Sequence, residues 1–151
     1  PRQSLRAVIP TIITQLARGE SRLRLGAVHP TRDLNFVDDI ARAFEAALDA
    51  PSAIGRVVNV GSGFEISIGD LARVIGEEMG ADFEIESEHE RLRPAASEVE
   101  RLLACNELAR TVLGWQPQHT GLDGLRAGLR KTIAWFTQPA NLARYRGGYT
   151  V

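Results

Sequence analysis

Three arginines between residues 91 and 101 could together bind an anion. Arg91, Arg93 and Arg101 each carry a planar guanidinium whose N–H donors match a phosphate or carboxylate group in a bidentate way. Pro94 fixes the backbone directly after Arg93, and the small residues that follow allow the chain to turn. The segment therefore predicts an anion-binding clamp. The alternative is a solvated surface loop, of which charged runs are also typical.

Other residues with chemical potential give weaker signals. Gly61 and Gly63 could belong to a phosphate-binding loop, but two glycines without a third and without a strand–loop–helix context favour an ordinary turn. Cys105 has no histidine beside it in the sequence, so it fits a small packed side chain better than a nucleophile. No metal site is expected, because metal-ligand spacing is lacking between the three histidines, His29, His89 and His119.

Composition limits the class of protein. A chain of 151 residues with 44% hydrophobic and 25% charged residues fits one compact domain spanning residues 1–151. The formal net charge of -1 argues against a general nucleic-acid binder. The single cysteine, the lack of a membrane-spanning apolar run and the lack of a signal-peptide layout predict a cytoplasmic protein with no membrane partner. The opening PRQS, without a methionine, reads as the interior of a longer protein.

Apolar residues at helical spacing predict the helices. The first begins near Pro10, because proline is tolerated in the first turn of a helix, and it ends before Gly19, a residue suited to a left-handed cap. The clearest apolar stripe belongs to the fifth helix. The predicted helices cover residues 10–18, 37–48, 67–79, 106–113 and 120–136, with a helical turn after residue 139.

Polar residues mark several of the helix starts. Ser67 followed by Asp70 resembles a capping box. Asp38 and Asp39 suit the positive N-terminal end of the second helix, and Asn106 is expected to cap the fourth. These assignments predict that the polar side chains act on their own helices.

Short alternating or β-branched runs predict the strands. RLRL alternates, RVVNV is rich in β-branched residues, and DFEIE sets apolar residues on one side and acids on the other, as in an exposed or edge strand. The predicted strands cover residues 22–25, 34–37, 56–60, 82–86 and 101–104. Helices that alternate with short strands indicate an α/β domain, whose strands must pair with one another or with a partner outside the chain.

Five segments form a recognisable combination of motifs: PRQS, LGAVHPTRDLNFVDDIARA, VVNVGSGFEISIGDL, RLRPAASEVERLL and LGWQP. Their order and intervals resemble the C-terminal half of extended short-chain dehydrogenases/reductases, in the NAD-dependent nucleotide-sugar epimerase/dehydratase family. Within that family, RPxxSEVxRL with LGWxP is most similar to 4,6-dehydratases acting on GDP- or UDP-linked sugars. The resemblance covers essentially all of the chain. It implies a substrate-binding α/β lobe with a small mixed sheet of short strands and about five to six helices.

The resemblance also implies that part of the enzyme lies outside this sequence. In the family, an N-terminal Rossmann domain carries the glycine-rich turn for NAD and a YxxxK pair for proton and hydride chemistry. Here Tyr145 and Tyr149 have no lysine four residues on, and no glycine-rich turn opens a βαβ unit. We therefore expect no catalytic residue and no bound NAD on this chain. The expected partners are a nucleotide sugar, the chain's own Rossmann domain and a second subunit.

The family's substrate contacts carry over onto five positions. Arg93 matches a diphosphate-binding arginine, and Arg32 lies where related enzymes place an arginine near the diphosphate or nucleoside. Glu98 falls where GDP-sugar dehydratases direct a glutamate to the ribose. A carboxylate can accept hydrogen bonds from both ribose hydroxyl groups. Arg2 and Asn35 are further candidates. Each also has a structural alternative, such as an ion pair of Arg32 with the following aspartate or a solvated Glu98.

Two other functions remain open from the residues alone. The domain could exist by itself and bind a nucleoside diphosphate without any chemistry. It could also be a protein-interaction domain, in which the apolar stripe from Leu122 to Phe136 packs on a partner and the arginines are surface residues.

Overall fold

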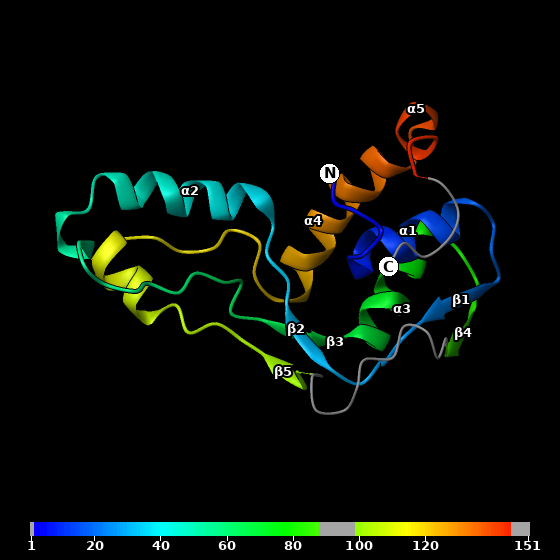
Figure 1. Ribbon diagram of the computed structural model, residues 1–151, viewed down its shortest axis with the longest axis horizontal. Helices are drawn as coiled ribbons and strands as arrows, with labels where there is room; N and C mark the ends of the chain where they lie inside the picture. The colour runs from blue at the N-terminus through cyan, green and yellow to red at the C-terminus, as the bar shows by residue number, and fades with distance from the viewer. Residues whose placement is uncertain (1, 88–98, 146–151) are drawn as a thin grey trace. The chain divides into compact units, whose positions relative to one another are not determined.

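A computed structural model describes residues 2–87 and 99–145 of the chain (Figure 1). Their contacts group into two compact units. Unit 1 comprises Pro1–Pro30, Ser67–Glu98 and Leu129–Val151, and unit 2 comprises Thr31–Ile66 and Val99–Gly128. Among the described residues, no helix combines the length and apolar character needed to cross a bilayer. The prediction of a single domain over residues 1–151 stays a prediction, and each unit is described by itself.

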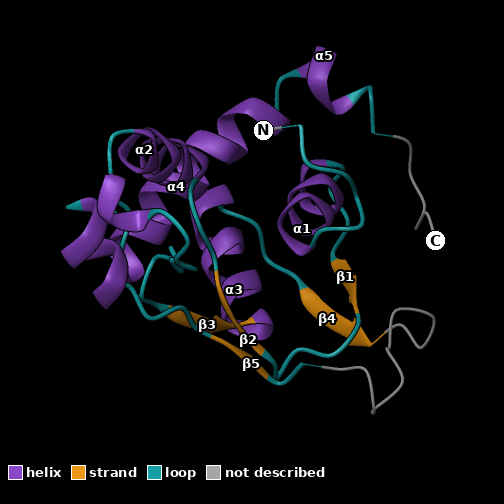
Figure 2. Cartoon of the chain, turned by 60° about the vertical axis from the view of Figure 1, so that its left-hand side comes forward, coloured by secondary structure: helices purple, strands orange, loops and turns teal. Residues whose placement is uncertain are grey.

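Unit 1 packs helices on a two-stranded parallel sheet. Its elements are α1 (Val8–Ala17), β1 (Arg22–Leu25), α3 (Ile68–Met79), β4 (Glu84–Ser87), the later part of α4 (Gly121–Phe136) and α5 (Pro139–Leu142). β1 and β4 lie side by side, with Leu23 opposite Ile85 (Figure 2). α1 packs on both α3 and β1. The core of this unit therefore lies between the two helices and the inner face of β1.

The sequence pattern explains how β1 and α1 are joined. Leu23 and Leu25 are buried while the two arginines of β1 are exposed, which is the predicted alternation of a half-buried strand. The Gln15 side chain, on α1, donates to the backbone oxygen of Arg24 at 3.2 Å and accepts from its backbone N–H at 2.9 Å. These two bonds attach the helix to the outer edge of the strand.

The helix ends in unit 1 follow the predicted local signals. α1 begins at Val8, which places Pro10 in its first turn, and Gly19 after it has a φ of 76°. Ser67 accepts a hydrogen bond from the backbone N–H of Asp70 and so caps α3, while Gly80 ends the helix in the left-handed conformation. These predictions are confirmed.

Unit 2 surrounds a three-stranded sheet with short helical segments. Its elements are β2 (Thr31–Asp33), α2 (Val37–Leu48), the 3-10 turn η1 (Pro51–Ala53), β3 (Glu65–Ser67), β5 (Arg101–Leu102), the π-helical segment η4 (Ala109–Leu113) and the first part of α4. The strand order is β3-β2-β5, and β2 runs parallel to β5 with Thr31 opposite Arg101 (Figure 1). A small core forms where Ala43, Ala109 and Trp115 meet.

The α/β class is confirmed, but two strand predictions in unit 2 need correction, and one strand of this unit was not predicted. The strand predicted at residues 34–37 lies earlier, at Thr31–Asp33, and β3 at Glu65–Ser67 was not predicted. Residues 56–60 belong to no sheet of the described chain. A strand is defined by its hydrogen-bonded neighbour, and the β-branched composition of this segment cannot supply one.

Candidate functional site

The carboxylate of Asp33 fills the centre of the Gly61–Gly63 loop. Asp33 is the last residue of β2, where pairing within the sheet fixes its position. Its Oδ1 accepts from the backbone N–H of Ser62 at 2.8 Å and from the Ser62 hydroxyl at 2.6 Å. Its Oδ2 accepts from the backbone N–H groups of Gly63 at 3.2 Å and of Ala104 at 3.1 Å. A loop of converging backbone donors is an anion site, and here the anion is an internal carboxylate.

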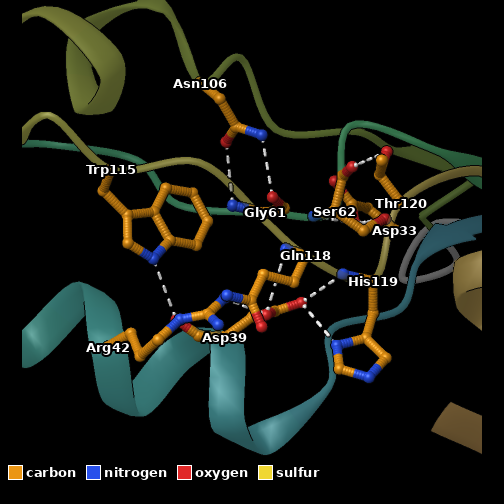
Figure 3. A network of polar contacts seen from close by, with 10 residues as sticks. All are labelled: Asp33, Asp39, Arg42, Gly61, Ser62, Asn106, Trp115, Gln118, His119 and Thr120. Carbon is orange, nitrogen blue, oxygen red and sulfur yellow. Dashed lines mark hydrogen bonds and ion pairs between the residues drawn. The ribbon is translucent and has the colours of Figure 1, made fainter.

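Two other side chains, those of Asn106 and Thr120, form hydrogen bonds with the backbone of the same loop (Figure 3). The Asn106 side chain accepts from the backbone N–H of Gly61 at 2.8 Å and donates to its carbonyl at 2.7 Å. The Thr120 hydroxyl donates to the Ser62 carbonyl at 2.6 Å. Asn106 thus bridges to another segment, and the prediction that it caps its own helix is wrong. The preference for an ordinary turn over a phosphate loop agrees with this arrangement, because Asp33 already occupies the loop donors.

A second carboxylate, that of the buried Asp39, organises the segment from Trp115 to His119 (Figure 3). Its side chain accepts from the backbone N–H groups of Gln118 at 3.1 Å and His119 at 2.9 Å. His119 Nδ1 lies 3.2 Å from Asp39 Oδ2, and Arg42 forms an ion pair with Oδ1. The indole Nε1–H of Trp115 donates to the Asp39 backbone oxygen at 3.0 Å. One aspartate therefore fixes a segment about eighty residues away.

The charge state of Asp39 follows from these contacts. Burial by itself raises the pKa of Asp39, but the backbone hydrogen bonds from His119 and Gln118 and the charges of His119 and Arg42 outweigh it. The net result is a pKa below its ordinary value of 3.8. Asp39 is therefore an anion near neutral pH, and it serves structure rather than substrate because its acceptors are already used.

Arg101, one of the three predicted clamp arginines, is engaged within the sheet. Its Nε donates to Glu65 Oε2 at 2.8 Å and its Nη2 to Oε1 at 2.7 Å, in a bidentate arrangement. The Thr31 hydroxyl donates to Oε2 at 2.8 Å. The hydrogen bonds from Arg101 and Thr31 lower the pKa of Glu65, and the Glu65 carboxylate raises that of Arg101. This guanidinium fork links β5 to β3 across β2.

The other predicted site residues fall in different parts of the chain. Arg32 is the middle residue of β2, half-buried, and its Nη1 donates to the Thr31 carbonyl at 2.8 Å. Asn35 is exposed, and its side chain donates to the Asp33 carbonyl at 3.4 Å. Both belong to unit 2. Arg2 is an exposed residue of unit 1 with a φ of 67°. Their roles in binding stay predictions.

Two of the predicted substrate contacts, Arg93 and Glu98, lie outside the described residues, together with Arg91. Their assignment as diphosphate and ribose contacts is therefore a prediction from sequence alone. Among the residues that the structure does describe, no group of three or more His, Cys, Asp or Glu side chains is placed to hold a metal ion.

Sequence reasoning missed the two residues that build this part of unit 2. Asp33 was considered only as an ion-pair partner of its neighbour, and Asp39 only as a charge at the start of α2. A signal was present for both. Asp33 ends β2 and Asp39 lies in the first turn of α2, while the segments that they bind are rich in glycine, proline and polar residues whose backbone N–H groups need acceptors.

An open hollow of about 630 Å³ lies beside these networks. Its lining includes Ser62, Asn106, Arg110, Gln116 and Thr120. Ser62, Asn106 and Thr120 already hold the loop together through the bonds described above. The hollow could therefore admit a polar ligand chiefly through Arg110 and Gln116.

Comparison with known sequences finds similar proteins that are named as epimerases and dehydratases of nucleotide sugars. The chain is 36% identical over 129 residues to a UDP-glucose 4-epimerase of Mycolicibacterium smegmatis, covering 85% of this chain and 38% of that protein. It is 31% identical over 136 residues to a dTDP-glucose 4,6-dehydratase of Streptomyces griseus, covering 90% of this chain and 39% of that protein. The chain therefore spans about two fifths of the length of these relatives.

Solved structures show the same fold. A UDP-glucuronic acid 4-epimerase from Bacillus cereus, in complex with UDP-glucuronic acid and NAD, matches with a TM-score of 0.78 and 26% identity, over 91% of this chain and 42% of that one. RMD from Pseudomonas aeruginosa, complexed with NADPH, matches with a TM-score of 0.75 and 26% identity, over 89% and 43%. The small α/β lobe is thus a recurring part of larger enzymes.

The decisive match extends over most of the sequence. Residues 1–127 fit the family described as GDP-mannose 4,6 dehydratase. This range contains the whole of unit 2 except its last residue, Gly128, and it includes the segments around Arg32, Arg93 and Glu98. The resemblance inferred from the motifs is confirmed: the chain belongs to the GDP-mannose 4,6-dehydratase family of nucleotide-sugar dehydratases and epimerases.

Proposed function

We propose that this chain is the nucleotide-sugar-binding part of an NAD-dependent nucleotide-sugar 4,6-dehydratase or a related epimerase, and that its arginines bind the nucleoside diphosphate. The observation that carries the proposal is the family match over residues 1–127. The names of the relatives differ in base and sugar, with UDP-glucose, dTDP-glucose and UDP-glucuronic acid among them. The nucleoside diphosphate is what these ligands share, so it is the part that we assign to the chain.

The geometry of β2 supports a role for Arg32. Successive side chains of a strand point to opposite faces, so Arg32 projects away from the face that carries Thr31 and Asp33. Thr31 and Asp33 are both committed to internal hydrogen bonds. Arg32 thus emerges on the other face of the three-stranded sheet. The strand fixes the backbone of Arg32, and the Thr31 carbonyl accepts a hydrogen bond from its guanidinium. A guanidinium oriented in this way can bind a diphosphate.

The nicotinamide cofactor does not fit the glycine loop of this chain. A dinucleotide phosphate would need the N–H donors of the Gly61–Gly63 loop, and the Asp33 carboxylate already accepts them. We propose that NAD binds a Rossmann domain that belongs to the parent protein, and that this chain alone catalyses no reaction. The carboxylate would also repel a phosphate at this loop.

Calorimetric titration of the 151-residue chain tests the proposal. We expect saturable but weak binding of GDP, UDP and their sugar conjugates, and no saturable binding of NAD or of glucose 1-phosphate. Loss of a bidentate arginine costs about 1.5–3 kcal/mol, roughly tenfold to more than a hundredfold in affinity. Arg93→Ala and Arg32→Ala should therefore weaken GDP and UDP binding by that factor, while Arg91→Ala, the matched control, should change it little.

Several outcomes would count against the proposal. Equal losses for Arg91→Ala and Arg93→Ala would mean that the segment acts through its summed charge alone. Arg93→Lys should restore only part of the affinity, because an ammonium cannot form two parallel bonds. If the chain bound duplex DNA more tightly than GDP and UDP at physiological salt, the arginines would be assigned to nucleic-acid binding instead.

A further inference from the structure

The hollow of about 630 Å³ in unit 2 has walls from three segments that hydrogen bonds hold in place. Asn106 binds the backbone of Gly61 through two hydrogen bonds, and the Thr120 hydroxyl donates to the Ser62 carbonyl (Figure 3). The indole N–H of Trp115 donates to the backbone of α2. A hollow of this size is typical of small-molecule sites. Because its walls are already fixed, binding a ligand would order little of the chain.

Three other side chains of the lining are available to a ligand. The Ser62 hydroxyl is already used, because it donates to Asp33 at 2.6 Å. Glu107, Arg110 and Gln116 are exposed, and their side chains form no hydrogen bond or ion pair with any other part of the chain that the structure describes. The hollow therefore presents a carboxylate, a guanidinium and an amide.

Glu107 and Arg110 carry opposite charges one helical turn apart. The backbone N–H of Arg110 donates to the Asn106 carbonyl at 2.9 Å, so the chain turns here as an α-helix does. Residues three apart in such a turn are neighbours on one face, with Cβ atoms about 5–6 Å apart. Arg110 also belongs to the π-helical segment η4, and such segments are frequent at functional sites. One small ligand can therefore reach both charges.

This pair of charges selects among classes of ligand. Of the described residues that line the hollow, Glu107 and Arg110 are the only charged ones. A phosphate bound by Arg110 would be repelled by the Glu107 carboxylate. Among the same described residues, no group of three His, Cys, Asp or Glu side chains is placed to hold a metal ion. An apolar ligand would remove both charges from water without giving them a partner. A ligand that bears both charges meets none of these objections.

We propose that the hollow binds a free α-amino acid with an uncharged polar side chain. Arg110 donates two parallel hydrogen bonds to the carboxylate of the ligand, and Glu107 accepts from its ammonium group. These two groups are bonded to one carbon atom, so they reach side chains that stand next to each other. The amide of Gln116 can both donate to the side chain of the ligand and accept from it. A charged side chain would find no counter-charge left in the lining.

The site is separate from the predicted diphosphate contacts. It includes neither Arg32 nor the residues of the clamp, Arg91 and Arg93. The two proposals can therefore fail independently of each other.

A titration of the 151-residue chain with L-glutamine, followed by two-dimensional NMR of the backbone amides, tests the proposal. We expect saturable shifts at Gly63, Arg110 and Gln116, with a dissociation constant of about 1 mM or lower. L-Glutaminamide lacks the carboxylate and glutaramate lacks the ammonium group. Each should bind at least tenfold more weakly, because it leaves one charge of the hollow without a partner. L-Glutamate, with a second carboxylate, should also bind more weakly than L-glutamine.

Variants of the two charged residues give a second readout. Arg110→Gln and Glu107→Gln should each weaken L-glutamine binding at least tenfold. Arg56→Gln and Glu45→Gln are the matched controls, since they remove the same charges from exposed positions of unit 2 outside this hollow, and they should leave binding unchanged. The spectra of the four variants also show whether each remains folded.

Several outcomes would overturn the proposal. One is the absence of saturable shifts at about 10 mM L-glutamine, and another is a set of shifts that avoids the lining of the hollow. Glutaramate that bound as well as L-glutamine would reveal a site for simple carboxylates. Equal losses for Arg110→Gln and Arg56→Gln would mean that only the net charge matters. L-Glutamine binding without GDP or UDP binding would support this site and refute the proposed function alone.

Discussion

The two units enclose different kinds of side chain. In unit 1 the fully buried side chains are mostly large and apolar, among them Ile12, Leu23, Leu71 and Phe136, all at 0% exposure. In unit 2 the apolar core is small, and a fully buried polar side chain, Asp39 at 2%, stands at the centre of a network of hydrogen bonds. Large apolar residues of unit 2 lie at the surface instead, among them Phe44, Leu48, Ile54 and Val57.

This difference indicates where each unit is most easily damaged. Burial of apolar area is roughly additive and tolerates some repacking, so unit 1 should lose stability in proportion to the volume removed. A carboxylate that accepts several backbone N–H groups is not replaceable in this way, because its loss leaves buried donors unsatisfied. Unit 2 should therefore be more sensitive to small polar changes than to the truncation of its large apolar residues.

The largest effect is expected from Phe136→Ala in unit 1. The Phe136 ring is fully buried and lies 4.9 Å from the ring of Trp135 and 5.0 Å from that of Tyr145. Its removal should lower the free energy of unfolding by about 3–5 kcal/mol, measured by urea denaturation. Phe44→Ala, the matched control in unit 2, should change it by less than about 0.5 kcal/mol, because the Phe44 side chain is exposed. Similar losses for the two would remove the contrast between the units.

The next effect is expected from Asp39→Ala. The substitution leaves the backbone N–H groups of Gln118 and His119 and the charge of Arg42 without their acceptor. Breaking a buried charged network of this kind costs about 3 kcal/mol. The exposed neighbour Asp38 is the matched control, and Asp38→Ala should cost less than about 1 kcal/mol, in the range of a helix-terminus charge. Denaturant unfolding of both variants makes the comparison.

Acid unfolding sharpens the same prediction. Because the folded pKa of Asp39 lies below its ordinary value of 3.8, the ionised carboxylate stabilises the fold above that value. This contribution should disappear as the pH falls below 3.8 and through the lowered pKa. In an Asp39→Asn variant the free energy of unfolding should depend less on pH in this window. An unchanged dependence would show that other carboxylates govern acid unfolding.

A smaller effect is expected from Gly61→Ala. A Cβ at residue 61 would lie 2.4 Å from the Ala104 Cβ and 2.5 Å from Asp33 Oδ2, so the loop would have to shift. We expect a loss of about 1–3 kcal/mol by thermal or urea unfolding. Gly69→Ala in α3 is the matched control, since its Cβ would find its nearest neighbour at an ordinary 3.5 Å. It should be neutral or stabilising because alanine favours the helix.

The smallest effect is expected from Arg101→Ala. The Arg101–Glu65 pair is solvent-exposed on the arginine side, so its loss should lower the thermal midpoint less than Phe136→Ala, Asp39→Ala or Gly61→Ala does. Added salt should reduce the difference from the unchanged protein. GDP and UDP affinity should stay the same, as in the control Arg73→Ala, which removes another exposed ion pair, in unit 1. A loss of affinity equal to that of Arg93→Ala would place Arg101 in the clamp after all.

Local signals in the sequence predicted most helix ends but little of the networks in unit 2. Gly19, Ser67 and Gly80 act on residues within one turn, so a short window contains the cause and its effect. Asp33 and Asp39 bind donors that are 29 to 80 residues away in the sequence. Composition and spacing do not reveal which distant segment a carboxylate will meet.

The strand at residues 56–60 shows the same limit in another form. A strand was predicted there from its β-branched residues, and Val58 and Val60 do face the core, yet no other segment of the described chain pairs with it. Conversely, β3 at Glu65–Ser67 has only three residues and exists because β2 lies beside it. Side-chain pattern sets the face of a strand, whereas pairing depends on which backbone lies next to it.

The two tryptophans make each unit separately visible to fluorescence. Trp115 is 4% exposed and hydrogen-bonded in unit 2, and Trp135 is half-buried among the rings of unit 1. With Trp135→Phe or Trp115→Phe, the remaining indole would report the unfolding of one unit only. Coincident transitions would identify a single cooperative folding unit, whereas two separate midpoints would show that the indole held by Asp39 is released independently of the other.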